Sequence, residues 1–173
     1  FVLSGKNSVV ITGAGSGIGF AIARRLAADG WSVVGLELDP QGADRLEAML
    51  GSGHTVVRGD AADRAVLRAA REAADALAPL AGWVNNVGIA VMGNLHEPDE
   101  AAVNRVISVN LMSHFWGASE AISAWVSRKT TGAIVNVSSV DLKFGSSFIT
   151  LSTVSSPGLN SVSSAQRRPQ PWR

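Results

Sequence analysis

The sequence contains no cysteine and no tyrosine. Without cysteine the chain can form neither a disulfide framework nor a cysteine-ligated metal site, and it has no thiol nucleophile. Its histidines, His54, His96 and His114, do not follow the spacing of metal ligands, so no metal site is predicted. No apolar run reaches the roughly 18 residues that cross a bilayer, and the start of the chain does not resemble a signal peptide. We therefore expect a cytoplasmic protein with no membrane partner.

Charge is also nearly balanced, because the formal net charge of the 173 residues is +1. This value gives no basic surface for nucleic acid. A hydrophobic content of 46% with 17% charged residues indicates one globular domain with a sizeable core. No acidic residue follows Asp141, and serine, arginine and proline are frequent towards the end. We predict one domain over residues 1–160 and a disordered tail over 161–173.

Short apolar runs alternate with segments of helical periodicity along the chain. Strands are predicted over 8–12, 31–38, 54–58, 82–85 and 132–137, and helices over 18–29, 39–50, 63–79 and 99–125. The strands are continuously apolar, which is typical of parallel strands covered on both faces. The pattern predicts an α/β fold with a doubly wound parallel sheet.

The junction between the first strand and the first helix is rich in glycine and runs from Thr12 to Gly19 (TGAGSGIG). Glycine permits a tight turn and close approach of a phosphate, and a helix N-terminus offers free N–H groups. Gly13 would make the turn, Gly17 would allow the approach and Gly19 would let the helix pack on the strand. No Gly-Lys-Ser/Thr follows, which disfavours a nucleoside-triphosphate P-loop. The alternative interpretation is a glycine-rich surface turn.

Three further motifs follow in order. They are Asn85 to Gly88 (NNVG), Val109-Asn110 on the long helix, and residues 134–139 (IVNVSS). Together with the glycine loop, they resemble the short-chain dehydrogenases/reductases over roughly residues 4–160, with Val87 in place of the family's alanine. The resemblance implies a Rossmann fold of about five strands in the order 3-2-1-4-5, with the last strands of the family missing.

The resemblance also implies a nicotinamide dinucleotide as cofactor. Glu37, at the end of the second strand, would accept hydrogen bonds from the adenosine ribose and repel a 2′-phosphate, which favours NAD(H) over NADP(H). Asp60 and Ala61 match the adenine contact, and Asn86 and Gly88 the nicotinamide-ribose side. Glu37 and Asp39 could alternatively be solvated turn acids, and Asp60 a helix-side or turn aspartate. The full set of implied cofactor residues is Gly13, Ser16, Gly17, Ile18, Gly19, Glu37, Asp60, Ala61, Asn86 and Gly88.

In the family's mechanism a tyrosine exchanges a proton with the substrate oxygen, aided by lysine, serine and asparagine side chains. Ser139 matches the catalytic serine, with Ser138 as the second choice, and Asn110 matches the asparagine, although it could simply bond helix backbone. The tyrosine and lysine positions are occupied by Ser152 and Ser156. A serine hydroxyl is far less acidic than a phenol with a pKa near 10. We therefore expect weak or absent activity.

Two functions remain open at this point. The first is an oxidoreductase that moves a hydride between the cofactor and a small alcohol or carbonyl compound. The second is a non-catalytic nucleotide-binding pseudo-enzyme, or a truncated or frame-shifted product. An unrelated flavodoxin-like module would require an accidental glycine loop. A homo-oligomer could form through the long helix 99–125, where Trp116 and Trp125 would serve either an interface or the core.

Overall fold

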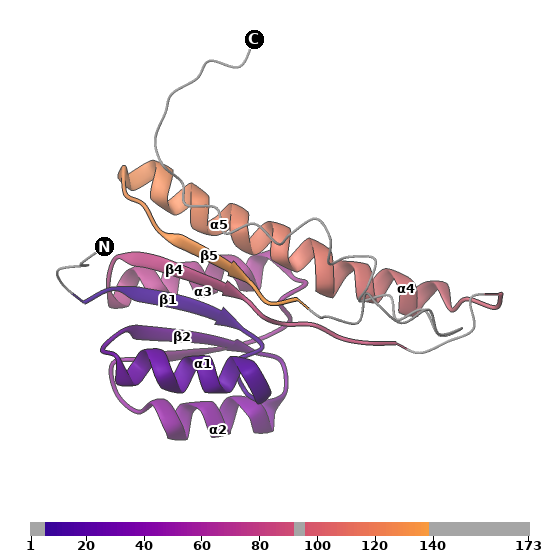
Figure 1. Ribbon diagram of the computed structural model, residues 1–173, viewed down its shortest axis with the longest axis horizontal. Helices are drawn as coiled ribbons and strands as arrows, with labels where there is room; N and C mark the ends of the chain where they lie inside the picture. The colour runs from indigo at the N-terminus through magenta and orange to yellow at the C-terminus, as the bar shows by residue number, and fades with distance from the viewer. Residues whose placement is uncertain (1–5, 92–95, 139–173) are drawn as a thin grey trace, which may run out of the picture.

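A computed structural model describes residues 6–91 and 96–138. In these residues one parallel sheet has the strand order β3-β2-β1-β4-β5 (Figure 1). Its strands are β1 (Ser8–Thr12), β2 (Ser32–Glu37), β3 (Thr55–Arg58), β4 (Leu80–Asn85) and β5 (Ala133–Asn136). The α/β class, the parallel sheet and the order predicted from the resemblance are confirmed.

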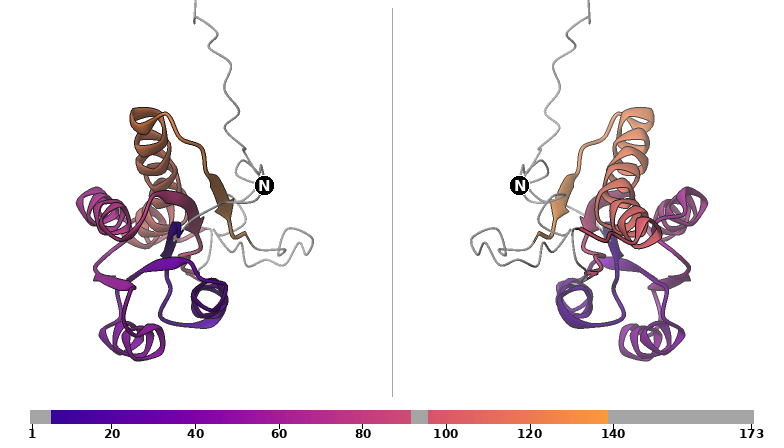
Figure 2. Two further views of the ribbon diagram at one scale, coloured as in Figure 1. Left: turned by 90° about the vertical axis from the view of Figure 1, so that its left-hand side faces the viewer. Right: turned by 90° about the vertical axis from the view of Figure 1, so that its right-hand side faces the viewer.

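Helices connect the strands on both faces of the sheet. They are α1 (Gly17–Ala28), α2 (Pro40–Leu50), α3 (Arg64–Leu77), α4 (Glu100–Ile107) and α5 (Ser113–Arg128), and the π-helical turn η1 (Ser108–Met112) joins the last two. Figure 2 shows α1 and α2 on one side of the sheet and α3 and α5 on the other. None of the helices described combines the length and the apolar character that a bilayer crossing requires.

The two faces of the sheet each bury alternate residues of the same strands. Val9 and Ile11 pack in the cluster formed with α1 and α2, whereas Val10 packs in the cluster formed with α3 and α5. Successive side chains of a strand point to opposite faces, so a sheet covered on both sides needs apolar residues at every position. This explains why β1 is buried along its whole length.

Helix α5 lies unusually close to β4 at Gly117. A Cβ atom at Gly117 would lie 2.6 Å from Asn85 Oδ1 and 2.7 Å from Trp83 Nε1. These two atoms are joined by a hydrogen bond of 2.8 Å in which the indole N–H donates. The small residue therefore allows the helix to pack directly on a buried polar pair. This contact sets the height of α5 above the end of β4.

Aspartates begin three of the helices. Asp39 accepts from the Gly42 N–H, Asp63 from the Ala65 N–H, and Asp99 from the Ala101 and Ala102 N–H groups. Such N-caps satisfy donors that have no partner within the helix. The predicted starts of these helices are confirmed.

Two predicted boundaries were wrong. Strand β4 begins at Leu80 rather than at residue 82, because Leu80 and Ala81 are buried in the sheet. The helix predicted over 99–125 is interrupted by the π-helical turn and continues to Arg128. It ends where Lys129 adopts a left-handed conformation with φ of 55°.

Candidate functional site

The glycine loop lies at the carboxyl end of β1, between β2 and β4. Gly13 and Gly17 have φ angles of 65° and 52°, which favour glycine. A Cβ atom at Gly19 would lie 2.2 Å from the Gly13 carbonyl oxygen, so this position has no room for a side chain. At Gly17 a Cβ would meet nothing within 4 Å. The loop is thus tightly packed at Gly19, whereas the space around Gly17, at the start of α1, is open.

The N-terminus of α1 differs from those of α2, α3 and α4. Its N-cap residue, Ser16, makes no side-chain capping bond, whereas aspartate side chains cap the other three helices. The first N–H groups of a helix carry a partial positive charge and bind anions when no side chain caps them. Gly17 and Ile18 are exposed at this end. The geometry therefore fits an anionic group of a ligand in front of α1.

The Glu37 carboxylate lies against the glycine loop. Its Oε2 accepts from the Gly15 N–H at 2.7 Å, and its Oε1 accepts from the Leu38 and Asp39 N–H groups, each at 3.0 Å. A Cβ at Gly15 would lie 2.7 Å from the same carboxylate, so glycine is needed for this approach. The three N–H donors hold the carboxylate beside the loop.

A cation reaches the same corner from α2. The Arg45 guanidinium donates to the Gly15 carbonyl oxygen at 3.2 Å. The sequence interpretation missed this residue, because a long side chain one helix away leaves no motif. Arg45 adds a positive charge near the carboxylate of Glu37.

Asp60 follows β3 and pairs with a residue of helix α4. Its Oδ2 lies 2.7 Å from Arg105 of α4, and its Oδ1 accepts from the Ala62 N–H at 2.9 Å. Burial alone would raise the pKa of Asp60, but the hydrogen bonds from Arg105 and Ala62 and the charge of Arg105 outweigh it and lower the pKa. The adjacent Ala61 is buried. Asp60 is therefore an ionised partner of Arg105 in this state of the protein.

Thr12 joins the ends of β1 and β4. Its hydroxyl oxygen accepts from the Asn86 N–H at 3.0 Å and from the Val87 N–H at 3.1 Å. In return, the Asn86 side-chain amide donates to the carbonyl oxygens of Thr12 and Gly13 at 2.9 and 3.0 Å. The glycine loop and the loop after β4 are thereby held as one unit. Asn86 thus lies in the junction of the two loops. Its predicted role on the nicotinamide-ribose side of the cofactor stays a prediction.

Asn85, just before this loop, lies inside the sheet. Its amide donates to Asn136 Oδ1 of β5 at 2.9 Å and to the His114 carbonyl oxygen at 3.1 Å. Asn85 therefore ties β4 to β5 and to α5.

Asn110 lies in the π-helical turn, and its side chain faces the loop after β4. Its Oδ1 accepts from the Ile89 N–H at 2.9 Å, and its Nδ2 donates to the Ile89 carbonyl oxygen at 2.8 Å. π-helical turns often occur at functional sites, because they displace one residue from the regular helix face. Both polar ends of the Asn110 side chain are thus used to hold the loop.

The serines predicted to take part in the chemistry are not all described. Ser139, Ser152 and Ser156 lie outside the described residues, whereas Ser138, just after β5, is described and exposed. Among the described residues no group of three or more potential metal ligands comes together.

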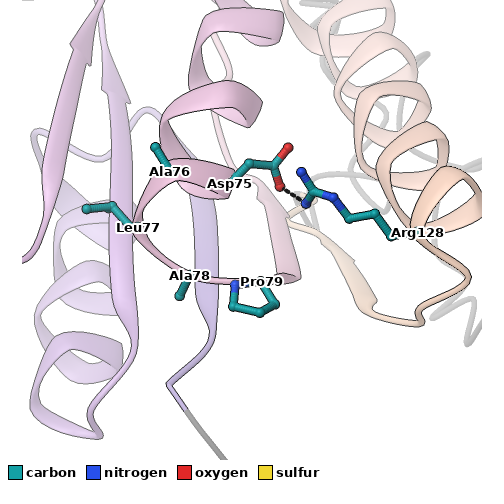
Figure 3. A pocket seen from close by; sticks show the side chains of 6 residues that line it. All are labelled: Asp75, Ala76, Leu77, Ala78, Pro79 and Arg128. Carbon is teal, nitrogen blue, oxygen red and sulfur yellow. Dashed lines mark hydrogen bonds and ion pairs between the residues drawn. The ribbon is translucent and has the colours of Figure 1, made fainter.

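A hollow lies at the opposite end of the strands from the glycine loop. It is lined by Asp75, Ala76, Leu77, Ala78, Pro79 and Arg128, where α3 ends and β4 begins (Figure 3). An ion pair between Asp75 and Arg128 crosses it. Ligands of open parallel sheets bind at the carboxyl ends of the strands, and this hollow lies near the amino end of β4. We assign the functional site to the glycine-loop edge instead.

Comparison with known proteins agrees with this geometry. The family model of short chain dehydrogenases matches residues 7–165. The chain belongs to the short-chain dehydrogenase/reductase family. Members of this family are oxidoreductases that generally bind NAD(P).

Several relatives act on hydroxyl compounds according to their names. The chain is 39% identical over 140 residues to 2-(S)-hydroxypropyl-CoM dehydrogenase 3 of Xanthobacter autotrophicus, covering 78% of this chain and 54% of that protein. It is 36% identical to galactitol 2-dehydrogenase of Cereibacter sphaeroides, over 75% and 51% of the two chains. A third relative, 35% identical over 69% and 52%, is named inactive 2-(S)-hydroxypropyl-CoM dehydrogenase 2, also of X. autotrophicus. The chain spans about half the length of these relatives.

The role of the Thr12 hydroxyl can be tested with the nearly isosteric Thr12→Val variant. Removing the acceptor leaves two backbone N–H groups unpaired, which is expected to lower the free energy of unfolding by about 1–3 kcal/mol. Urea denaturation followed by circular dichroism measures the loss.

The matched control is Thr55→Val in β3. Among the described residues no hydrogen bond is made by the Thr55 hydroxyl, so this variant should change the free energy of unfolding by less than about 0.5 kcal/mol. Equal stabilities of the two variants would show that the Thr12 junction contributes nothing specific.

Proposed function

We propose that this chain binds NAD(H) across the carboxyl ends of β1, β2 and β4. The observation that carries the proposal is the uncapped N-terminus of α1 behind the glycine loop. The neighbouring helices use aspartates for their caps, so α1 is the one among these that leaves its first N–H groups to an external anion. The pyrophosphate would take this place, close to Gly17 and Ile18. The adenosine would extend towards Glu37.

The preference for NAD(H) over NADP(H) rests on the position of the Glu37 carboxylate. It lies 2.7 Å from the Gly15 N–H and is held by two further donors, so it cannot easily turn away from the loop. A 2′-phosphate on the adenosine ribose would meet this negative charge. Arg45 opposes the preference with its positive charge, but its guanidinium is already bonded to the Gly15 carbonyl oxygen. We therefore assign the discrimination to Glu37.

At the other end of the cofactor, Asn86 and Gly88 would line the nicotinamide ribose. When bound, the cofactor supplies a hydride that can be exchanged with an alcohol or carbonyl group. Asn110 would hold the loop after β4 in place, and Ser139 would orient the substrate oxygen, as the resemblance implies.

Turnover is proposed to be weak or absent. The chain has no tyrosine, and Lys143 is its last lysine. Ser152 and Ser156, at the positions of the proton donor and its lysine partner, supply neither an acidic phenol nor a positive charge. Without the donor, the alkoxide that forms on carbonyl reduction receives no proton from a positioned group. The proposal is supported by the relative that is named inactive 2-(S)-hydroxypropyl-CoM dehydrogenase 2.

A homo-oligomer through the long helix is also proposed. Trp125 is 3% exposed and donates to the Leu80 carbonyl oxygen, so it belongs to the core. Trp116 is partly buried below the guanidinium of Arg64. The exposed apolar residues of α5 are instead Phe115, Ile122 and Val126, with exposures of 54%, 42% and 72%. Their spacing of seven and four places them on one helix face, which a second copy of this helix would cover.

Cofactor binding can be tested by titrating the purified chain with NADH and with NADPH, followed by fluorescence. The wild type should bind NADH more tightly. Glu37→Gln removes the negative charge but keeps the shape of the side chain, and it should reduce the NADH-to-NADPH preference by about tenfold.

Glu47→Gln is the matched control, because Glu47 is an exposed acid of α2 that pairs with Arg58. This variant should leave both affinities unchanged. An unaltered preference in Glu37→Gln would refute the assignment of Glu37, and no saturable binding by the wild type would refute the proposal as a whole.

The weak turnover is tested by NADH oxidation with a panel of small ketones. We expect kcat/KM roughly 10²–10⁴-fold below that of galactitol 2-dehydrogenase with its own substrate, which is the usual contribution of a positioned acid. Ordinary turnover by this chain would show that the absent tyrosine is dispensable.

The proposed interface is tested by light scattering after size-exclusion chromatography. Phe115→Lys combined with Ile122→Lys places two charges on the apolar helix face and should convert the oligomer to monomers. Leu38→Lys, at an exposed apolar residue after β2, should leave the mass unchanged. A wild-type monomer, or a double variant that keeps its oligomeric mass, would contradict the proposed interface.

A further inference from the structure

We propose that His114 is a positioning residue for the nicotinamide end of the cofactor site, where it fixes the orientation of the peptide between Val87 and Gly88. The inference rests on the proposed binding of NAD(H). The resemblance to the family assigned a role to Asn110 but none to His114.

The imidazole of His114 is buried under the loop after β4. Its Nε2 lies 2.9 Å from the Val87 carbonyl oxygen, and the residue is 5% exposed. Because a carbonyl oxygen can only accept, Nε2 carries the proton and donates. Burial lowers the pKa of His114 and outweighs the opposite effect of the bond to Val87, so the imidazole is neutral near pH 7.

The backbone of His114 is anchored as well. Its carbonyl oxygen accepts from the Asn85 side-chain amide at 3.1 Å, and Asn85 is fully buried in β4. Gly117, one turn further, brings α5 against the same asparagine. The imidazole therefore projects from a fixed point of the helix towards the loop.

The bond to Val87 determines where the next N–H group points. The described chain contains no cis peptide bond, and in a planar trans peptide the C=O and the following N–H point in opposite directions. Because the Val87 C=O points to His114, the Gly88 N–H points away from the helix. Gly88 itself is exposed.

Asn110 fixes the next peptide in the same sense. The Ile89 N–H donates to Asn110 Oδ1, so the Gly88 C=O also points away from the helix. His114 and Asn110 are four residues apart and reach successive peptides of one loop. Together they aim both main-chain polar groups of Gly88 at the open side, where a ribose or a carboxamide could bond to them.

The role can be tested with two substitutions that differ in one donor. His114→Leu removes the hydrogen bond, whereas His114→Gln keeps an N–H donor at a similar reach. His96→Leu controls for loss of an exposed histidine. Calorimetric titration of each full-length protein uses NADH, which carries the nicotinamide ribose, and ADP, which lacks it.

We expect His114→Leu to weaken NADH binding about tenfold and to change ADP binding by less than twofold. His114→Gln should remain within about threefold of the wild type for both ligands. In the ligand-free proteins, ¹⁵N relaxation should show a lower order parameter at Gly88 in His114→Leu than in His114→Gln.

Three outcomes would overturn the proposal. They are equal losses of NADH and ADP affinity in His114→Leu, unchanged NADH affinity, and a His114→Gln variant that behaves like His114→Leu. If the wild type binds neither ligand, the proposed function fails. The relaxation measurement then decides separately whether His114 orients the Gly88 peptide.

Discussion

The hydroxyl of Thr12 is the contact on which the candidate site depends. It accepts two N–H groups from the loop after β4, and the Asn86 amide returns two hydrogen bonds to the end of β1. The hydrogen bonds that pair β1 with β4 stop where the strands end. Without the Thr12 junction, the two loops that follow these strands could therefore move apart. The glycine loop would bind one part of a dinucleotide and the loop after β4 another. The junction holds the two loops at a fixed distance, so that they could form one extended site for a dinucleotide.

No acidic side chain in the first turn of α1 neutralises the partial positive charge at its N-terminus. The N-terminus of α1 is left uncapped, while the Glu37 carboxylate accepts from the Gly15 N–H. A pyrophosphate and a ribose require different partners, because phosphate oxygens need hydrogen-bond donors and ribose hydroxyl groups need an acceptor. In the proposed complex, the N-terminus of α1 would supply the donors and Glu37 the acceptor. Arg45 donates to the carbonyl oxygen of Gly15, beside the same carboxylate contact.

Periodicity and capping residues predicted the order of elements well, because these signals are local. Asp39, Asp63 and Asp99 mark helix starts by chemistry that needs only a few neighbouring residues. The π-helical turn at Ser108–Met112 was not predicted, and the contact that Asn110 makes from it joins residues 21 positions apart, which no local pattern reports. For the same reason the pairings of Arg45 with Gly15 and of Arg105 with Asp60 were missed. Contacts made by long side chains across elements leave no spacing in the sequence.

The proposed cofactor binding and the proposed chemistry depend on different parts of this chain. In the part of the chain that the structure describes, the contacts that shape the proposed cofactor site, from Thr12 to His114, join residues within β1 to α5. None of them requires Ser139, Ser152 or Ser156. A proton donor, in contrast, must be both acidic enough and placed at the substrate oxygen, and serine meets the first condition poorly. The loss of the tyrosine would therefore remove turnover while leaving the contacts for the dinucleotide intact, so binding without catalysis is a physically consistent state of this chain.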